Sequence, residues 1–160
     1  MSGLSLGEAS SPIGRKARLL RLRARLWAVT REFFTARGFL EVDTPLLALG
    51  VPVEAHVEPF AVTLTTRGGP CPRYLPTSPE AGLKRALAVL GQDLFEVGHA
   101  FRDGEEEGPL HRAHFRMLEW YRLNATYTAI QDDVADYFAA LRPLLAEAAA
   151  VGLGAPHPAL

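Results

Sequence analysis

The sequence predicts an α+β fold with a mainly antiparallel sheet, and three observations support this class. Strand-like and helix-like segments follow one another without the strict alternation of a parallel βαβ protein. Two strand-like segments, 94–102 and 114–123, are separated by a polar loop, as in a long-looped hairpin. Two long amphipathic segments lie before and after the strands. A chain of 160 residues with 48% hydrophobic and 22% charged residues can form one globular domain, or part of a larger one.

The N-terminal part predicts a leader, a helix and a short strand. Residues 1–14 are small, polar and rich in Gly and Ser, which indicates a disordered leader. Lys16–Arg37 has apolar residues at three- and four-residue steps and stops at Gly38, so we expect an amphipathic helix there. Phe39–Asp43 is a predicted short strand that ends at the following Thr-Pro, since proline cannot donate to a strand ladder.

The middle of the chain predicts two more strands and a helix. His56–Thr65 alternates in polarity and carries β-branched residues, and after an Arg-Gly-Gly-Pro turn a second short strand covers Arg73–Leu75. Proline is favoured at the first position of a helix, and Ser and Thr are favoured as caps. We therefore expect a helix over Pro79–Leu90, with Thr77 or Ser78 as its cap.

The C-terminal part predicts a second long helix and a tail. Residues 128–149 form an amphipathic pattern that we expect to be interrupted near Pro143. Residues 151–160 are rich in Gly and Pro and are typical of a linker. The apolar face of the predicted helix consists of Ile130, Val134, Tyr137, Phe138, Leu141 and Leu145.

Charge and cysteine content limit the classes of function. A net charge of −1 gives no general attraction to nucleic acid or to a membrane surface. One cysteine excludes an internal disulfide framework and fits a reducing compartment. No apolar run approaches the roughly 18 residues that a membrane span needs, and the histidines lack metal-ligand spacing. These features predict a soluble cytoplasmic protein without a metal-binding histidine cluster.

The hairpin carries the residues with the clearest chemical potential. With a period of two, Phe115, Glu119 and Tyr121 share one strand face, and Arg102 is in register with Glu96 on the other strand. A guanidinium can fork onto a phosphate, a phenyl ring can stack on a purine, and a carboxylate beside a phenol can hold an ammonium group. A half-buried strand with purely structural side chains is the alternative that this pattern leaves open.

Three segments resemble the class II aminoacyl-tRNA synthetases. Residues 17–45 and the sequence RGFLEVDTPLL resemble motif 1, and FEVGHAFRDGEEEG followed by HFRMLEWYR resembles motif 2. Between them, LPTSPEAGLKRAL resembles a segment of the lysine subgroup. The resemblance covers about residues 17–145. It implies an antiparallel sheet flanked by helices, with residues 15–150 as a partial catalytic domain from which the glycine-rich motif 3 is absent.

The resemblance also implies roles for individual residues. Arg102 would be the catalytic residue, binding the α-phosphate of ATP as the amino-acid carboxylate attacks it. Phe115 would stack on adenine, and the acid at the adenine edge would be Glu105. His111 would approach the outer phosphates. Mg²⁺ is the expected second cofactor, with its ligands in the missing part of the domain. The residues expected to bind the amino acid are Glu80 for the α-amino group, and Glu119 and Tyr121 for the lysine side chain.

Within the family, the resemblance points to the paralogue of lysyl-tRNA synthetase that modifies elongation factor P. Only about 15 residues precede the motif 1 helix, too few for an anticodon-binding barrel. The implied reaction joins lysine or β-lysine to a lysine of elongation factor P through an adenylate. A homodimer through the motif 1 helix is expected, and tRNA binding is not. Without motif 3, we expect this chain alone to be inactive. A lysyl-tRNA synthetase fragment and a non-catalytic paralogue acting as a regulatory or dimerisation module remain as alternatives.

Overall fold

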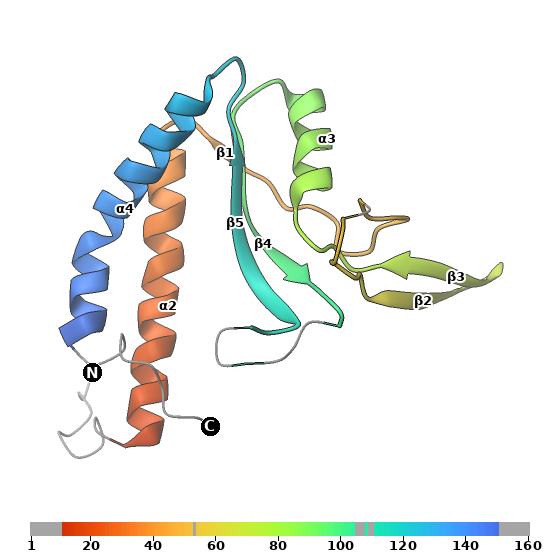
Figure 1. Cartoon of the computed structure of the whole chain (residues 1–160), viewed down its shortest axis with the longest axis horizontal. Helices are drawn as coiled ribbons and strands as arrows, with labels where there is room; N and C mark the ends of the chain where they lie inside the picture. The colour runs from red at the N-terminus through yellow and green to blue at the C-terminus, as the bar shows by residue number, and fades with distance from the viewer. Residues whose placement is uncertain (1–10, 53, 105–107, 109–110, 151–160) are drawn as a thin grey trace. The chain divides into compact units, whose positions relative to one another are not determined.

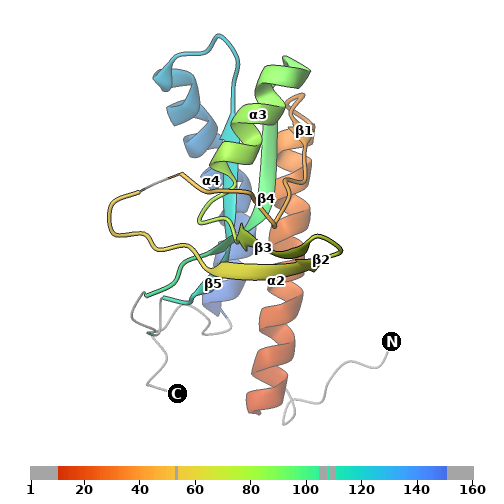
Figure 2. The same ribbon diagram turned by 90° about the vertical axis from the view of Figure 1, so that its right-hand side faces the viewer.

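A computed structural model describes residues 11–52, 54–104, 108 and 111–150. The chain divides into two compact units. One is formed by the segments before Arg37 and after Ala125, and the other by Arg37–Ala125. Figure 1 and Figure 2 show that helices make up the described part of the first unit, while strands and one helix make up the second. The structure thus confirms the predicted α+β class.

The first helix, α2 (Pro12–Thr35), begins earlier than predicted. The Ser11 hydroxyl accepts a hydrogen bond from the backbone N–H of Gly14 at 3.1 Å, and Pro12 occupies the first turn. This serine cap followed by proline is a common helix start. The predicted disordered leader 1–14 is therefore wrong for its last residues, and its residues 1–10 lie outside the described part.

Helix α2 packs against α4 (Tyr127–Ala150) through aromatic rings. The Tyr137 ring lies with its centroid 5.3 Å from that of Phe33 and 5.8 Å from that of Phe34, and both phenylalanines are buried. The Tyr137 hydroxyl and the Thr30 hydroxyl form a hydrogen bond of 2.7 Å. These contacts supply the apolar burial that two amphipathic helices need to stabilise each other.

Helix α4 differs from its prediction in two respects. It continues through Pro143 without the expected interruption. The exposed proline removes one N–H donor, and the helix persists on both sides of it. Of the predicted apolar face, Leu141 is buried, but Val134, Phe138 and Leu145 are exposed. The buried positions include Asp133 and Leu144.

The main sheet has the order β1-β4-β5. Strands β4 (Leu94–Phe101) and β5 (His114–Tyr121) are antiparallel and form the predicted long-looped hairpin. Strand β1 (Leu40–Glu41) is shorter than predicted and pairs with β4 in parallel. The sheet is therefore mixed, and only its larger pairing is antiparallel. Strand β4 is largely buried, as expected for the central strand of three.

Strands β2 (Ala61–Thr66) and β3 (Gly69–Tyr74) form a separate two-stranded sheet. The first strand starts five residues later than the predicted His56. His56 lies in a turn and has a left-handed backbone conformation with φ of 64°. The second strand begins at Gly69, so it is longer than the predicted Arg73–Leu75. Gly69 has φ of +104°, which explains why the turn needs glycine there.

Helix α3 (Glu80–Leu90) packs on β4 and β5. Its cap is Pro79, whose carbonyl accepts from the Leu83 N–H at 2.9 Å, and no side chain caps the helix. The predicted capping by Thr77 or Ser78 is therefore wrong. Leu83 of α3 is fully buried, and Gly91 ends the helix in a left-handed conformation. This packing carries Glu80, in the first turn, to the hairpin.

Candidate active site

The register of the hairpin places the predicted site residues on one face. Glu96 lies opposite Glu119, and Ala100 lies opposite Phe115. Arg102 follows the last residue of β4, and its backbone N–H donates to the Ala113 carbonyl at 2.9 Å, so the pairing continues past the strand. Because side chains alternate along a strand, the structure confirms that these residues share one face.

Arg102 and Phe115 are in direct contact. The central guanidinium carbon of Arg102 lies 5.2 Å from the centre of the Phe115 ring, a cation–π distance. The Arg102 Nε donates to the Thr77 carbonyl at 3.4 Å. A positive fork and an aromatic ring therefore lie next to each other, as a nucleotide site requires.

Glu119 and Tyr121 form a polar pair further along the same face. The Tyr121 hydroxyl donates to Glu119 Oε1 at 2.7 Å. Burial raises the pKa of the Glu119 carboxyl above its ordinary value, the Tyr121 hydrogen bond acts in the opposite direction, and the nearby Glu80 charge raises it further. Burial and the Glu119 carboxylate together raise the pKa of Tyr121. A half-buried carboxylate held by a phenol is suited to bind an ammonium group.

Glu80 and Lys84 add charges from helix α3. They form an ion pair one helical turn apart. The hydrogen bond that the Lys84 ammonium donates to the Glu80 carboxylate raises the pKa of Lys84. Glu80 and Lys84 both act electrostatically on Glu119, and so does Glu54. The sequence reasoning named Glu80 but missed Lys84, which the four-residue spacing could have indicated, and Glu54, which no local pattern indicated.

Glu96 is a buried acid that the sequence reasoning placed on this face without a role. Only 3% of its surface is exposed. Its Oε1 accepts hydrogen bonds from the Thr44 backbone N–H at 3.3 Å and the Thr44 hydroxyl at 3.1 Å. Its Oε2 is buried and has no hydrogen-bond partner among the described residues. Burial, opposed by the Thr44 hydrogen bonds, raises the pKa of this carboxyl.

The hairpin loop is described only in part. Glu105 lies outside the described residues. His111 is exposed, and its backbone exchanges hydrogen bonds with Gly108 at 3.2 and 3.3 Å. Asp103 is anchored by its N–H, which donates to the Glu58 carbonyl at 2.8 Å. Of the residues predicted to bind ATP, the structure thus brings Arg102 and Phe115 together and places His111 in the loop.

The other face of the hairpin carries two histidines. His99 Nδ1 and His114 Nε2 are 2.6 Å apart, and the His114 ring stacks on Phe101 with centroids 4.6 Å apart. His114 forms this pair on the face opposite Phe115. The histidine pair is therefore separate from the Arg102–Phe115 contact.

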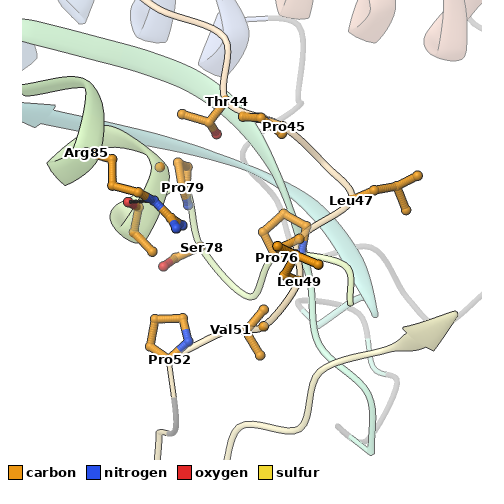
Figure 3. A pocket seen from close by; sticks show the side chains of 14 residues that line it. Thr44, Pro45, Leu47, Leu49, Val51, Pro52, Pro76, Ser78, Pro79 and Arg85 are labelled. Atoms are coloured by element: carbon orange, nitrogen blue, oxygen red, sulfur yellow. Dashed lines mark hydrogen bonds between the residues drawn. The ribbon is translucent and has the colours of Figure 1, made fainter. Parts of the chain in front are cut away.

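A cavity of about 410 Å³ lies between the loop after β1 and the start of helix α3. Figure 3 shows its walls, which are the loop after β1 and the start of α3. The lining is mostly apolar, with Thr44, Ser78 and Arg85 as polar members, and the Arg85 Nε donates to the Ala81 carbonyl at 3.0 Å. None of the predicted site residues lines it. The cavity shares Thr44 and Pro79 with the surroundings of Glu96.

In the part of the chain that the structure describes, no group of three or more His, Cys, Asp or Glu side chains could hold a metal ion. Within the same residues, no helix combines the length and the hydrophobicity that a membrane crossing requires.

The fold and the site define a module of the class II synthetase type: a mixed sheet whose hairpin presents an arginine, an aromatic ring and a carboxylate on one face. A family model described as tRNA synthetases class II (D, K and N) matches residues 14–147. The chain belongs to this family.

Among curated proteins, the chain is similar to proteins named elongation factor P–(R)-beta-lysine ligase. It is 38% identical to the one from Sodalis glossinidius over 138 residues, which are 85% of this chain and 41% of that protein. It is 37% identical to the one from Yersinia enterocolitica and 36% identical to the one from Yersinia pestis, with the same coverage. The chain thus spans about two fifths of the length of these relatives.

Proposed function

We propose that the protein activates lysine or β-lysine with ATP as an adenylate and transfers it to a lysine of elongation factor P. The similarity to proteins named elongation factor P–(R)-beta-lysine ligase supports the reaction class. The observation that carries the proposal is the single face on which Arg102 lies over Phe115 and Glu119 bonds to Tyr121. One end of this face suits a nucleotide, and the other suits an ammonium group.

In the first step, a carboxylate oxygen of the amino acid attacks the α-phosphorus of ATP. An acyl–phosphate bond forms, the bond to the β-phosphate oxygen breaks, and pyrophosphate leaves. Arg102 moves from the Phe115 ring onto the α-phosphate oxygens and stabilises the negative charge that develops there. Phe115 then offers its ring to adenine. Bound side by side, the two reactants meet without the entropic cost of a free encounter.

The acidic end of the face selects the amino acid. Glu119, held by Tyr121, receives the side-chain ammonium, and Glu80 receives the ammonium nearer the carboxylate. Lys84 already pairs with Glu80 in an exposed ion pair. The substrate ammonium therefore either displaces Lys84 from the Glu80 carboxylate or shares that carboxylate with it. A neutral side chain would leave the half-buried Glu119 without a counter-charge, which disfavours it.

In the second step, the amine of a lysine on elongation factor P attacks the adenylate carbonyl. An amide bond forms, AMP leaves with the electrons of the acyl–oxygen bond, and the amine loses a proton. ATP and Mg²⁺ remain the expected cofactors, and a cytoplasmic location remains a prediction.

Pyrophosphate exchange tests the first step. The protein expressed from its complete gene should exchange labelled pyrophosphate into ATP when lysine or (R)-β-lysine is present. Aspartate and asparagine, the other amino acids of the matched family, should support no exchange. Exchange with either of them and not with lysine would refute the substrate assignment.

The acceptor is tested separately. Labelled lysine should appear on elongation factor P and not on tRNA. Labelling of tRNA alone would favour the lysyl-tRNA synthetase alternative. Isothermal titration with ATP and a non-hydrolysable lysyl-adenylate analogue tests the non-catalytic alternative, because a purely structural module should bind neither.

A further inference from the structure

The starting observation is the position of Glu96 directly opposite Glu119 on neighbouring strands. Two carboxyl groups so placed repel each other when both are charged. Glu96 is nearly fully buried, and its Oε2 has no hydrogen-bond partner among the described residues. A buried carboxylate without full pairing is costly, so this acid needs a structural reason to be there.

Thr44 connects Glu96 to helix α3. On one side, its backbone N–H and hydroxyl donate to Glu96 Oε1. On the other side it packs against Gly82 of α3, where an added Cβ would lie 2.6 Å from the Thr44 Cβ and Cγ2. The helix approaches this closely because position 82 has no side chain. Thr44 is therefore a spacer between β4 and α3.

A second glycine makes room for the Glu96 carboxyl. A Cβ at Gly98 would lie 2.8 Å from Glu96 Oε1 and 2.8 Å from Pro79 Cγ. Pro79 immediately precedes Glu80 and caps α3. Figure 3 labels Thr44 on the loop after β1 and Pro79 at the start of this helix. Glu96 thus bonds to Thr44, and Gly98 leaves open the space that the Glu96 carboxyl and Pro79 border.

We propose that Glu96 is a positioning residue for the amino-acid site: through Thr44 it holds the first turn of α3, and with it Glu80, at a set distance from Glu119. The identity of the amino-acid ligand rests on the proposed function. The positioning of α3 by Glu96 and Thr44 does not depend on that function. Burial raises the pKa of the Glu96 carboxyl, which agrees with its enclosed position beside Thr44.

Amide hydrogen exchange tests the positioning directly. In Glu96→Ala and Thr44→Val, the N–H groups of Leu83 and Lys84 should exchange about tenfold faster, because the first turn of α3 loses its anchor. Thr44→Ser and Glu96→Gln keep the hydroxyl donor and the carbonyl acceptor, so both should retain most of the protection. Thr63→Val on the exposed strand β2 is the matched control and should change nothing.

Ligand titration tests the consequence for the site. Glu96→Ala and Thr44→Val should weaken binding of the lysyl-adenylate analogue about tenfold, the loss of roughly one well-formed hydrogen bond. Binding of AMP, which uses Arg102 and Phe115, should stay within about twofold of wild type. This split separates positioning from a general loss of structure, which would weaken both ligands.

The outcomes are decisive in each case. Unchanged exchange in α3, or equal losses for the analogue and for AMP, would overturn the proposal. If the wild-type chain binds no analogue, the proposed function fails, and the exchange rates still decide the positioning role. If Glu96→Ala does not fold, the comparison of Thr44→Val with Thr44→Ser still tests the positioning role, with Glu96→Gln as the conservative variant.

Discussion

At the scale of single residues, the Arg102 side chain contacts the Phe115 ring and donates from Nε to the Thr77 carbonyl at 3.4 Å. A phosphate offers a guanidinium two charge-assisted hydrogen bonds, which are stronger than a cation–π contact.

The first prediction concerns this guanidinium. Arg102→Ala should lower ATP affinity at least about a hundredfold, since it removes a charge-assisted fork worth about 3 kcal/mol. Isothermal titration with ATP measures the loss. Arg67→Ala, in the exposed turn between β2 and β3, is the control and should bind as wild type. Equal affinities for all three proteins would exclude Arg102 from the nucleotide site.

The second prediction is the pH dependence of lysine binding. Glu119 holds an ammonium only when it is ionised, and burial raises its pKa above 4.5 in a setting that also contains Glu80, Lys84 and Glu54. Affinity for lysine should therefore be full at neutral pH and should fall as the pH falls through this raised pKa, earlier than for an ordinary glutamate. Titration calorimetry between about pH 4 and pH 8 measures the curve from the ordinary glutamate pKa of about 4.3 upward.

Glu119→Gln provides the matched variant for that curve. It should bind lysine roughly 10- to 100-fold more weakly at neutral pH, since a charged hydrogen bond is lost. Below the raised pKa, the wild type should approach the affinity of the variant. A wild-type curve that stays flat over the whole range would show that Glu119 does not contact the ammonium.

At the scale of elements, the approach of α3 to the sheet depends on glycines. The third prediction is that Gly98→Ala destabilises the protein by about 1–3 kcal/mol, because its Cβ would meet Glu96 and Pro79 in a packed region. Urea unfolding measures the change. Gly50→Ala, where nothing lies within 4 Å of an added Cβ, should stay within about 0.5 kcal/mol of wild type. A neutral Gly98→Ala would show that this region is loosely packed.

The fourth prediction concerns the proline inside α4. Pro143 is exposed and breaks the hydrogen-bond ladder of a continuous helix. Pro143→Ala should restore one backbone hydrogen bond and raise the free energy of unfolding by about 1–3 kcal/mol. Urea unfolding and the helical circular dichroism signal check it. A loss of stability would mean that the proline maintains a bend that the packing of α2 on α4 requires.

At the scale of the whole molecule, dimerisation remains a prediction. Helix α2, which resembles the motif 1 helix, leaves Leu19 and Leu20 46% and 56% exposed. The fifth prediction is that the protein elutes with about twice the 17.4 kDa chain mass in light scattering, and that Leu20→Glu shifts it to the monomer by placing a charge in an apolar contact. Val89→Glu, at an exposed position of α3, should leave the mass unchanged. A monomeric wild type would contradict the prediction.

The sequence predicts which hairpin residues share a face, because alternation along a strand is a local pattern. Alternation along β5 indicated that Phe115, Glu119 and Tyr121 share a face, and the register confirms it. Errors arose where packing or capping overrode the local pattern. Helix α2 started at a serine cap that composition alone had assigned to a leader. Helix α4 continued through a proline that usually ends a helix.

The sequence by itself determined the α+β class, the hairpin and the side of the sheet that carries Arg102, because strand alternation and helical periodicity are properties of neighbouring residues. The tertiary structure alone decided which other charges surround Glu119. Thr44 and Glu96 are 52 residues apart in the chain, and Glu54 reaches Glu119 from another loop. Such contacts depend on how closely α3, β1 and β4 pack. Glycine positions and burial determine this packing, and no local sequence pattern encodes it.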